Sequence, residues 1–261
     1  MPLADRFDGY LVDLDGVVWI GREPVSGSVA ALRELQEGGK RIVFVTNNPG
    51  RLPQAYAERL RELGVAVEPE QIVTAGTAVA RLAGEAAAAA DGTAFVIGAA
   101  ALKEMVAATG ARLLEGKEAE GADVVVVSGH KGFDYGELRT AKFALDRGAG
   151  LFATSHDPTM PYPGGELPGT GAVLAAVEVA SGKQATIAGK PERHLFEQAK
   201  AAAGAGRLAM VGDRVSSDIA GGRAAGLETI LVLSGTTSRE QAEAADPAPD
   251  HVLDDLAALL K

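Results

Sequence analysis

The sequence predicts an α/β protein with a doubly wound, Rossmann-like parallel sheet that is interrupted by an inserted α/β domain. In the first part of the chain, short apolar runs alternate with helical segments, which is typical of parallel strands joined by crossover helices. Between residues 46 and 190 there is far more chain than one crossover requires. This length predicts a second domain inserted within the first.

The order of the expected elements places the domain boundaries. We expect the core to begin with a strand at 10–15, a helix at 28–37, a strand at 41–46 and a helix at 53–63. The inserted part has strands and helices of its own: strands at 94–97, 124–127 and 151–154, and helices near 99–108, 135–147 and 171–180. The last elements we expect are a strand at 185–189, a helix at 192–202 and a strand at 208–212. The predicted core is therefore 1–78 and 185–261, and the predicted insert is 79–184.

Two acidic residues stand at the end of the first apolar run. Asp13 and Asp15 are two residues apart, and in a strand such residues share a face. Two carboxylates on one face cost stability unless a ligand binds them, and hard cations such as Mg²⁺ prefer carboxylate, carbonyl and water oxygens. Gly16 then permits a tight turn and a close approach of the backbone to a ligand. An ordinary surface turn would explain the same residues, so the motif alone leaves both interpretations open.

Polar residues also end three later segments. Thr46 and Asn47 follow the second apolar run and offer a hydroxyl and an amide to an anion. Lys190 lies at a strand-to-helix corner, where Pro191 suits the first residue of the helix. Asp213 follows a later strand. Each has an ordinary explanation, but together they gather at strand ends, where open α/β sheets bind ligands.

This set of groups suits a phosphate monoester. The oxygens of such an ester repel nucleophiles, so an enzyme must neutralise them and hold attack and departure in line. Mg²⁺ held by Asp13, Asp213 and a backbone carbonyl would do the first. Lys190 and the Thr46 hydroxyl would bind the remaining oxygens. Asp13 can then attack phosphorus to form an aspartyl-phosphate, and Asp15 would protonate the leaving alkoxide and later activate water.

Asp218 and the histidines allow two interpretations each. Asp218, near the start of the last predicted helix, is either an acid that stabilises a helix N-terminus or a group that orients the water shell of the metal. The four histidines lack metal-ligand spacing. His130 and His156 lie in polar loops that follow strands of the insert, and such loops either face the site or are simply solvated.

At this point the sequence resembles the haloacid dehalogenase superfamily of phosphatases, and within it subfamily IIA, which acts on nucleotides, p-nitrophenyl phosphate, phosphoglycolate and glycerol phosphate. The matching stretches are DLDGVVW at 13–19, VTNNP at 45–49, PGTGAVLAAVEVASG at 168–182, GKP at 189–191 and GDRVSSDI at 212–219. They span nearly the whole chain in the family's order. Pro49 and Ser216 depart from the common pattern, and their roles stay open.

The resemblance implies roles for particular residues. It assigns the nucleophile to Asp13 and the acid and base to Asp15, whose main-chain oxygen would bind the metal. It also makes the insert a large cap that closes over the site and carries substrate-selective side chains. In the cap loop we expect His156 and Met160 to meet the leaving group, with His130 next in line. Many relatives have other residues at positions 155 and 156, so the substrate's identity stays open.

Charge and composition exclude several classes of function. The 261 residues carry a formal charge of −10, which argues against a nucleic acid partner because phosphate backbones are bound by clustered Lys and Arg. Without cysteine the chain has no disulfide, thiolate metal site or cysteine nucleophile. No stretch is long and apolar enough to span a bilayer, and no secretion signal opens the chain, so we expect no membrane partner and a cytoplasmic location. The oligomeric state stays open, a homodimer included.

The leading hypothesis is a Mg²⁺-dependent phosphatase that hydrolyses small phosphorylated metabolites. Two alternatives use the same groups. Phosphoryl transfer to another acceptor, or mutase action, would need no different residues. A receiver-type signalling domain also places acids, a hydroxyl and a lysine around a phosphate-accepting aspartate, but it is a short single domain without an insertion.

Overall fold

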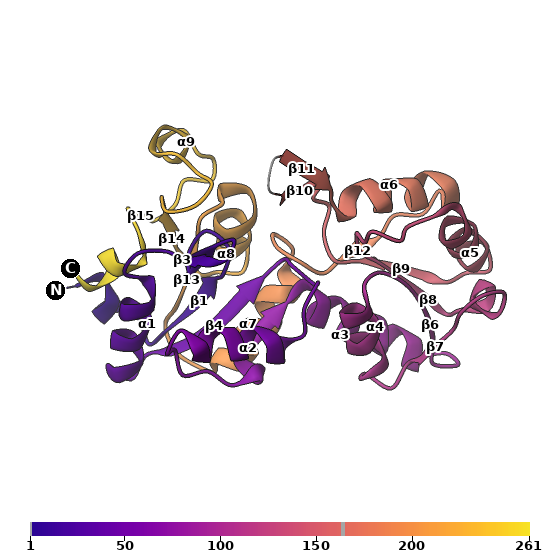
Figure 1. Ribbon diagram of the computed structural model, residues 1–261, viewed down its shortest axis with the longest axis horizontal. Helices are drawn as coiled ribbons and strands as arrows, with labels where there is room; N and C mark the ends of the chain where they lie inside the picture. The colour runs from indigo at the N-terminus through magenta and orange to yellow at the C-terminus, as the bar shows by residue number, and fades with distance from the viewer. Residues whose placement is uncertain (1, 163–164) are drawn as a thin grey trace. The chain divides into compact units, whose positions relative to one another are not determined.

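The computed structural model describes residues 2–162 and 165–261, and its packing divides the chain into two units (Figure 1). The first unit contains the chain up to Thr46, Pro53–Val73 and Lys190–Lys261. The second contains Asn47–Leu52 and Thr74–Gly189. Among the described residues, none of the helices combines the length and the hydrophobicity needed to span a membrane.

The first unit is built on a six-stranded sheet with β1 near its middle. The order is β15-β14-β13-β1-β4-β5, with bounds β1 Gly9–Asp13, β4 Arg41–Thr46, β5 Ile72–Thr74, β13 Leu208–Gly212, β14 Glu228–Val232 and β15 His251–Leu253. β1 pairs in parallel with both β4 and β13. From β1 the chain proceeds to one side through β4 and β5, and it returns later on the other side through β13, β14 and β15. The predicted doubly wound sheet is therefore confirmed, and its switch point lies between β1 and β13.

Helices and short turns surround this sheet, so its central strands are buried. All five residues of β1 and of β13 are buried, as expected for strands covered on both faces. The helical elements of the unit are η1 Leu3–Arg6, α1 Ser28–Glu37, α2 Pro53–Glu62, η2 Pro69–Gln71, α7 Arg193–Ala203, η4 Val215–Ile219, α8 Ala220–Ala224, α9 Arg239–Glu243 and η5 Leu256–Leu260. A short hairpin of β2 (Trp19–Ile20) and β3 (Glu23–Pro24) follows β1.

The second unit has a parallel sheet of its own. Its strand order is β12-β9-β8-β6-β7, with bounds β6 Thr93–Ile97, β7 Arg112–Leu113, β8 Val124–Val127, β9 Gly150–Ala153 and β12 Thr186–Ile187. The other elements are α3 Ala75–Ala88, α4 Ala100–Ala107, η3 Glu118–Gly121, α5 Tyr135–Asp146, α6 Thr170–Ser181 and a hairpin of β10 (Thr159–Tyr162) and β11 (Gly165–Pro168). The insert is thus an α/β unit with its own apolar core.

Four details differ from the sequence-based expectation. The strand at 185–189 is shorter and pairs with β9, so these residues belong to the second unit and not to the core. Residues 74–78 also fall to the second unit, because they begin α3. The helix expected at 192 begins at Arg193 with Glu192 as its N-cap, so Pro191 is not its first residue. The last predicted helix, which has Asp218 near its start, begins with a π-helical turn, η4.

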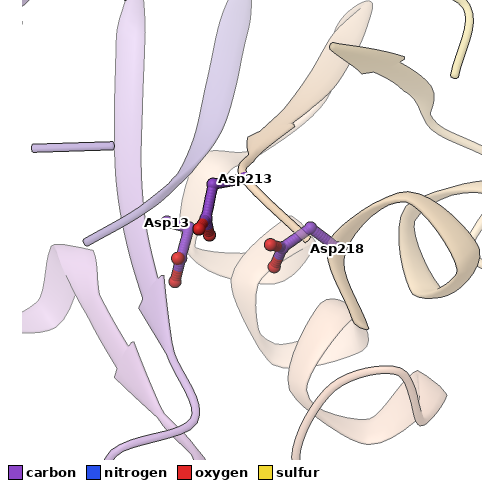
Figure 2. A group of neighbouring side chains, drawn as sticks. All are labelled: Asp13, Asp213 and Asp218. Carbon is purple, nitrogen blue, oxygen red and sulfur yellow. The ribbon is translucent and has the colours of Figure 1, made fainter. Parts of the chain in front are cut away.

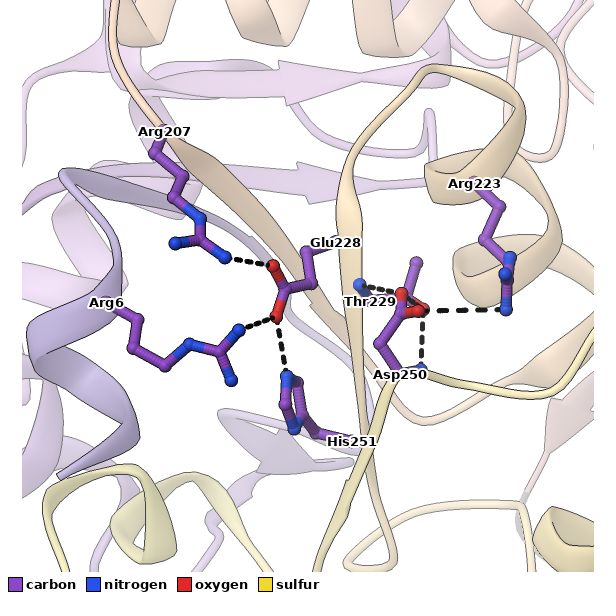
Figure 3. A network of polar contacts seen from close by, with 7 residues as sticks. All are labelled: Arg6, Arg207, Arg223, Glu228, Thr229, Asp250 and His251. Atoms are coloured by element: carbon purple, nitrogen blue, oxygen red, sulfur yellow. Dashed lines mark hydrogen bonds and ion pairs between the residues drawn. The ribbon is translucent and has the colours of Figure 1, made fainter. Parts of the chain in front are cut away.

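Polar contacts at the amino ends of β14 and β15 hold this part of the sheet together (Figure 3). Glu228, the first residue of β14, pairs with Arg6 at 2.9 Å and with Arg207 at 2.7 Å, and its Oε1 lies 2.7 Å from His251 Nε2. These contacts, the one with His251 first, hold the pKa of the Glu228 carboxyl below its usual 4.5. A carboxyl whose pKa is lower in the folded protein than in the unfolded chain stabilises the fold at pH values above the unfolded pKa. This stabilisation is lost as the pH falls through the folded pKa.

We therefore expect Glu228→Gln to lower the free energy of unfolding at pH 7 by about 1 kcal/mol, the scale of a partly exposed ion-pair cluster. The deficit should shrink as the pH falls below 4.5 and through the lowered pKa of the folded protein, because the wild-type carboxyl is then protonated too. Urea unfolding of both proteins at pH 7 and at a pH well below 4.5 measures the difference. The exposed Glu58→Gln on α2 is the control. A deficit that is the same at both pH values would contradict this role of the charge.

Candidate active site

The carboxyl ends of the central strands place the predicted site residues of the first unit at one edge of the sheet. Asp13 is the last residue of β1, Thr46 is the last of β4, and Asp213 directly follows β13. β1 lies between the other two strands. The edge beside the switch point of a doubly wound sheet is where such folds bind ligands, so position alone makes this edge the candidate site.

Three carboxylates meet at this edge (Figure 2). One ligand atom from each of Asp13, Asp213 and Asp218 lies within 4.8 Å of those of the others, and all three residues are buried. Asp218 is carried by η4, the π-helical turn after β13. Its Oδ2 accepts the backbone N–H of Arg214 at 3.0 Å. Gly212 makes room for it, because a Cβ at 212 would lie 2.2 Å from the Cβ of Asp218.

Lys190 joins two of the carboxylates. Its Nζ donates to Asp13 Oδ1 and to Asp218 Oδ1, both at 2.6 Å, and the side chain is buried. Burial alone would lower the pKa of Lys190, but Asp13 and Asp218 more than offset this and raise it. Lys190 is therefore a fixed positive charge within hydrogen-bonding distance of Asp13.

The carboxylates outnumber the positive charge among them. Burial raises the pKa of Asp13, and Asp218 and Asp213 raise it further, while Lys190 opposes the shift. Burial also raises the pKa of Asp213, with the charge of Asp218 adding to it and a hydrogen bond from Thr236 opposing it. The site thus holds an excess of buried negative charge, which a bound cation would relieve.

The loop after β14 holds Asp213 through two hydrogen bonds, and its residues are not among the predicted site residues. The backbone N–H of Thr236 donates to Asp213 Oδ2 at 2.6 Å, and the Thr237 hydroxyl donates to the Asp213 carbonyl at 2.6 Å. A Cβ at Gly235 would lie 2.1 Å from Asp213 Oδ2, so only glycine permits this approach. Gly16, with φ of +91°, packs equally close, since its Cβ would lie 2.4 Å from the same oxygen. In the sequence, polar residues follow the apolar strand β14, and this pattern was the available signal that the loop belongs to the site.

This set of donors fits a divalent cation. Asp213 Oδ2 is held by the Thr236 N–H, whereas Asp213 Oδ1 is buried and has no hydrogen-bond partner among the described residues. Three carboxylates and one ammonium leave a formal charge of −2. A hard cation such as Mg²⁺ takes carboxylate oxygens, so the unpaired oxygen and the excess charge both suit it.

Asp15 lies outside this buried group. The strand predicted to reach it ends at Asp13, so Asp13 and Asp15 do not share the face of one strand. Asp15 is exposed, forms an isolated bridge with Trp19, and its Oδ1 accepts the indole N–H of Trp19 at 3.0 Å. The two acids therefore occupy different environments, one buried beside a lysine and the other open to solvent.

The remaining predicted residues belong to the second unit. Asn47 follows Thr46 directly in the chain, and its unit begins there. His130 Nε2 lies 2.8 Å from Glu137 Oε2, so His130 has a partner within its own unit. His156 is exposed, and Met160 on β10 is 47% exposed. The parts of these four residues in binding stay predictions.

The comparisons with known proteins agree with this fold. Family models described as haloacid dehalogenase-like hydrolase and HAD-hydrolase-like match residues 10–112 and 187–259. The chain belongs to the haloacid dehalogenase-like hydrolases, which confirms the resemblance seen in its motifs. A D-glycerol 3-phosphate phosphatase of Mycobacterium tuberculosis is 36% identical over 260 residues, which is 98% of this chain and 72% of that protein.

Solved structures show the same relationship. A glycerol phosphate phosphatase from Mycobacterium tuberculosis, crystallised in complex with magnesium, superimposes with a TM-score of 0.90 at 35% identity, covering 100% of this chain and 78% of that one. A p-nitrophenyl phosphatase from Archaeoglobus fulgidus superimposes with a TM-score of 0.89 at 31% identity, covering 97% of this chain and 98% of that one. The similarity thus extends over both units.

Proposed function

We propose that this protein is a Mg²⁺-dependent phosphatase that hydrolyses small phosphomonoesters through an aspartyl-phosphate. The observation that carries the proposal is the cluster of three buried carboxylates, two of which bind Lys190, with Asp213 Oδ1 left without a partner among the described residues. The names of the relatives support it, since they are phosphatases of glycerol phosphate and p-nitrophenyl phosphate. In this proposal the first unit is the catalytic core and the second unit is the cap.

Asp13, Asp213 and the main-chain carbonyl of Asp15 would hold the metal. When bound, Mg²⁺ would neutralise phosphoryl oxygens and so lower the repulsion that an attacking carboxylate meets. Thr46, with Asn47 beside it in the chain, would hold further phosphoryl oxygens. Asp218 would act indirectly, because it accepts a second hydrogen bond from the Lys190 ammonium that binds Asp13 and would support the water shell of the metal.

The proposed reaction has two steps, and in each of them one bond to phosphorus forms while another breaks. Asp13 attacks phosphorus, forming a bond from its carboxylate oxygen, while the ester bond to the leaving oxygen breaks. Asp15 gives a proton to that leaving alkoxide. In the second step Asp15 takes a proton from water, the water oxygen bonds to phosphorus, and the bond to Asp13 breaks to release inorganic phosphate. Lys190, bonded to Asp13 Oδ1, fixes the rotation of the attacking carboxyl.

Phosphate release with and without metal tests the proposal. The protein should release inorganic phosphate from glycerol phosphate or p-nitrophenyl phosphate in Mg²⁺, lose this activity in excess chelator, and regain it when Mg²⁺ is restored. Full activity in metal-free buffer would contradict the proposed site. Release that requires an added acceptor would favour a phosphotransferase, and a single equivalent without turnover would favour a receiver-like domain.

Selectivity among esters is expected to depend on the second unit. The core residues address the phosphoryl group and the metal, which every candidate ester shares, so they distinguish one alcohol poorly from another. We expect His156→Ala and Met160→Ala to change the ratios of kcat/KM among sugar, polyol, nucleotide and glycolate phosphates by about 10-fold, and so to change their ranking. Mg²⁺ affinity should not change. An unchanged ranking in both variants would place selectivity elsewhere, with His130 and Lys131 the next residues to test.

A further inference from the structure

We propose that Trp19 is a positioning residue that fixes the carboxyl of Asp15 through its indole N–H. This inference rests on the proposed function, in which Asp15 is the acid and base. The indole Nε1 donates to Asp15 Oδ1 at 3.0 Å. Trp19 is only 1% exposed, whereas Asp15 is exposed, so a rigid buried ring holds a carboxyl that solvent reaches.

The backbone between the two residues folds tightly enough to hold this contact. The Gly16 N–H donates to the Trp19 carbonyl at 2.7 Å, and the Trp19 N–H donates to the Leu14 carbonyl at 3.2 Å. Gly16 adopts a φ of +91°, which glycine adopts without steric cost. The chain therefore turns back on itself just after Asp15 and returns the indole to its side chain.

A second element holds the indole ring. The guanidinium of Arg59, on α2, lies 3.9 Å from the centroid of the Trp19 ring, a cation–π contact. The same side chain donates to the Gly21 carbonyl at 2.9 Å, in the turn of the β2–β3 hairpin. Arg59 thus fixes both the ring and the turn that follows it, so the position of the indole N–H is set by two elements of the unit.

The consequence for Asp15 is chemical. An indole N–H only donates, so it holds Oδ1 as an acceptor and leaves Oδ2 open for proton transfer. One oxygen is then anchored, and the other is free to give or receive the proton. In the proposed reaction, the proton moves from Asp15 Oδ2 to the leaving alkoxide oxygen and is replaced from the attacking water. A carboxyl without this anchor would rotate and present the proton in fewer productive orientations.

An isosteric replacement separates this role from simple core packing. Trp19 belongs to the apolar core of the first unit, so its bulk matters for stability as well. It is the single tryptophan of the chain, so 3-benzothienylalanine incorporated in place of tryptophan alters this position alone. That analogue keeps the fused ring and has sulfur where the indole has N–H. Trp19→Phe is a second variant that also removes the donor, at a cost in volume.

The loss of rate should depend on the leaving group. With glycerol phosphate, whose alkoxide needs the proton, we expect the isostere to lower kcat about tenfold, the scale of one hydrogen bond to a charged group. With p-nitrophenyl phosphate, whose leaving group departs with little protonation, the fall in kcat should be smaller, because only the activation of water in the second step still needs the anchored carboxyl. The thermal unfolding temperature and the Mg²⁺ affinity should match those of the wild type. Equal losses on both esters would overturn the proposal.

A double substitution provides the second test. In an Asp15→Asn background the isostere should cause no further loss on glycerol phosphate, because the proton that Trp19 positions is gone. A full additional loss there would show that Trp19 acts independently of Asp15 and would overturn the proposal. Assays of the wild-type protein distinguish a failure of the proposed phosphatase function from a failure of the proposed role of Trp19. No phosphate release by the wild type in Mg²⁺ would refute the phosphatase itself, whereas normal wild-type turnover with an isostere of equal activity on both esters would refute only the role of Trp19.

Discussion

Asp13→Asn should abolish phosphate release. The amide keeps the shape of the carboxyl but cannot attack phosphorus as an anion, so no aspartyl-phosphate forms and no alternative residue replaces it at the end of β1. We expect kcat to fall by at least about 10³-fold, the scale of losing a covalent step. A rapid-quench assay with labelled substrate should also show no base-labile phosphoenzyme.

The stability of the same variant distinguishes lost chemistry from unfolding. Asp13 is one of three neighbouring buried carboxylates, and Lys190 keeps its contact with Asp218 when Asp13 becomes neutral. Removing one of the like charges relieves repulsion, so the unfolding temperature without metal should be equal to that of the wild type or higher. Asp254→Asn, which changes an exposed surface pair with Arg239, is the matched control and should keep full activity. Wild-type turnover in Asp13→Asn would overturn the assignment of the nucleophile.

The strand ends were predictable because position and chemistry coincide there. An apolar run that ends in a carboxylate, a hydroxyl or a lysine is visible in the sequence without any contact being known. For Asp13, Thr46 and Asp213, the parallel sheet then brings those ends to one edge. The fold class was predictable for a similar reason, since alternating strands and helices leave few ways to cover both faces of a sheet, and the observed sheet confirms it.

The contacts between distant segments were not predictable in the same way. Asp218 holds Lys190, from which it is separated by 28 residues, and only tertiary packing sets that pair. Asp213 is held by the backbone N–H of Thr236, a group that almost every residue carries, so the polar residues after β14 indicate a site there without indicating this contact. β12 is two residues long, and hydrophobic pattern does not say which of two sheets such a strand joins. The second unit extends to Gly189, so the predicted boundary between residues 184 and 185 lies too early in the chain.

The environment of Asp15 also differs from the predicted one, for a geometric reason. The alternation of a strand does not extend to Asp15, because the chain leaves β1 at Asp13 and turns at Gly16. Asp13 is thereby buried beside Lys190, and Asp15 is exposed with a single anchor from Trp19. Two acids in such different settings suit two different tasks, one as a nucleophile and the other as a carrier of protons.

Asp15→Asn tests that division of tasks, because the amide keeps an oxygen for the Trp19 N–H and loses only the proton. Metal binding should persist, since Asp15 is proposed to lend the metal its main-chain carbonyl, and calorimetric titration with Mg²⁺ measures this directly. On glycerol phosphate we expect kcat to fall by about 10² to 10⁴, the usual contribution of general acid–base catalysis. On p-nitrophenyl phosphate the fall should be smaller, because only the second step, activation of water, still needs Asp15. Equal falls on both esters would assign Asp15 a structural role, and a loss of Mg²⁺ affinity would show that its side chain contributes to the metal site.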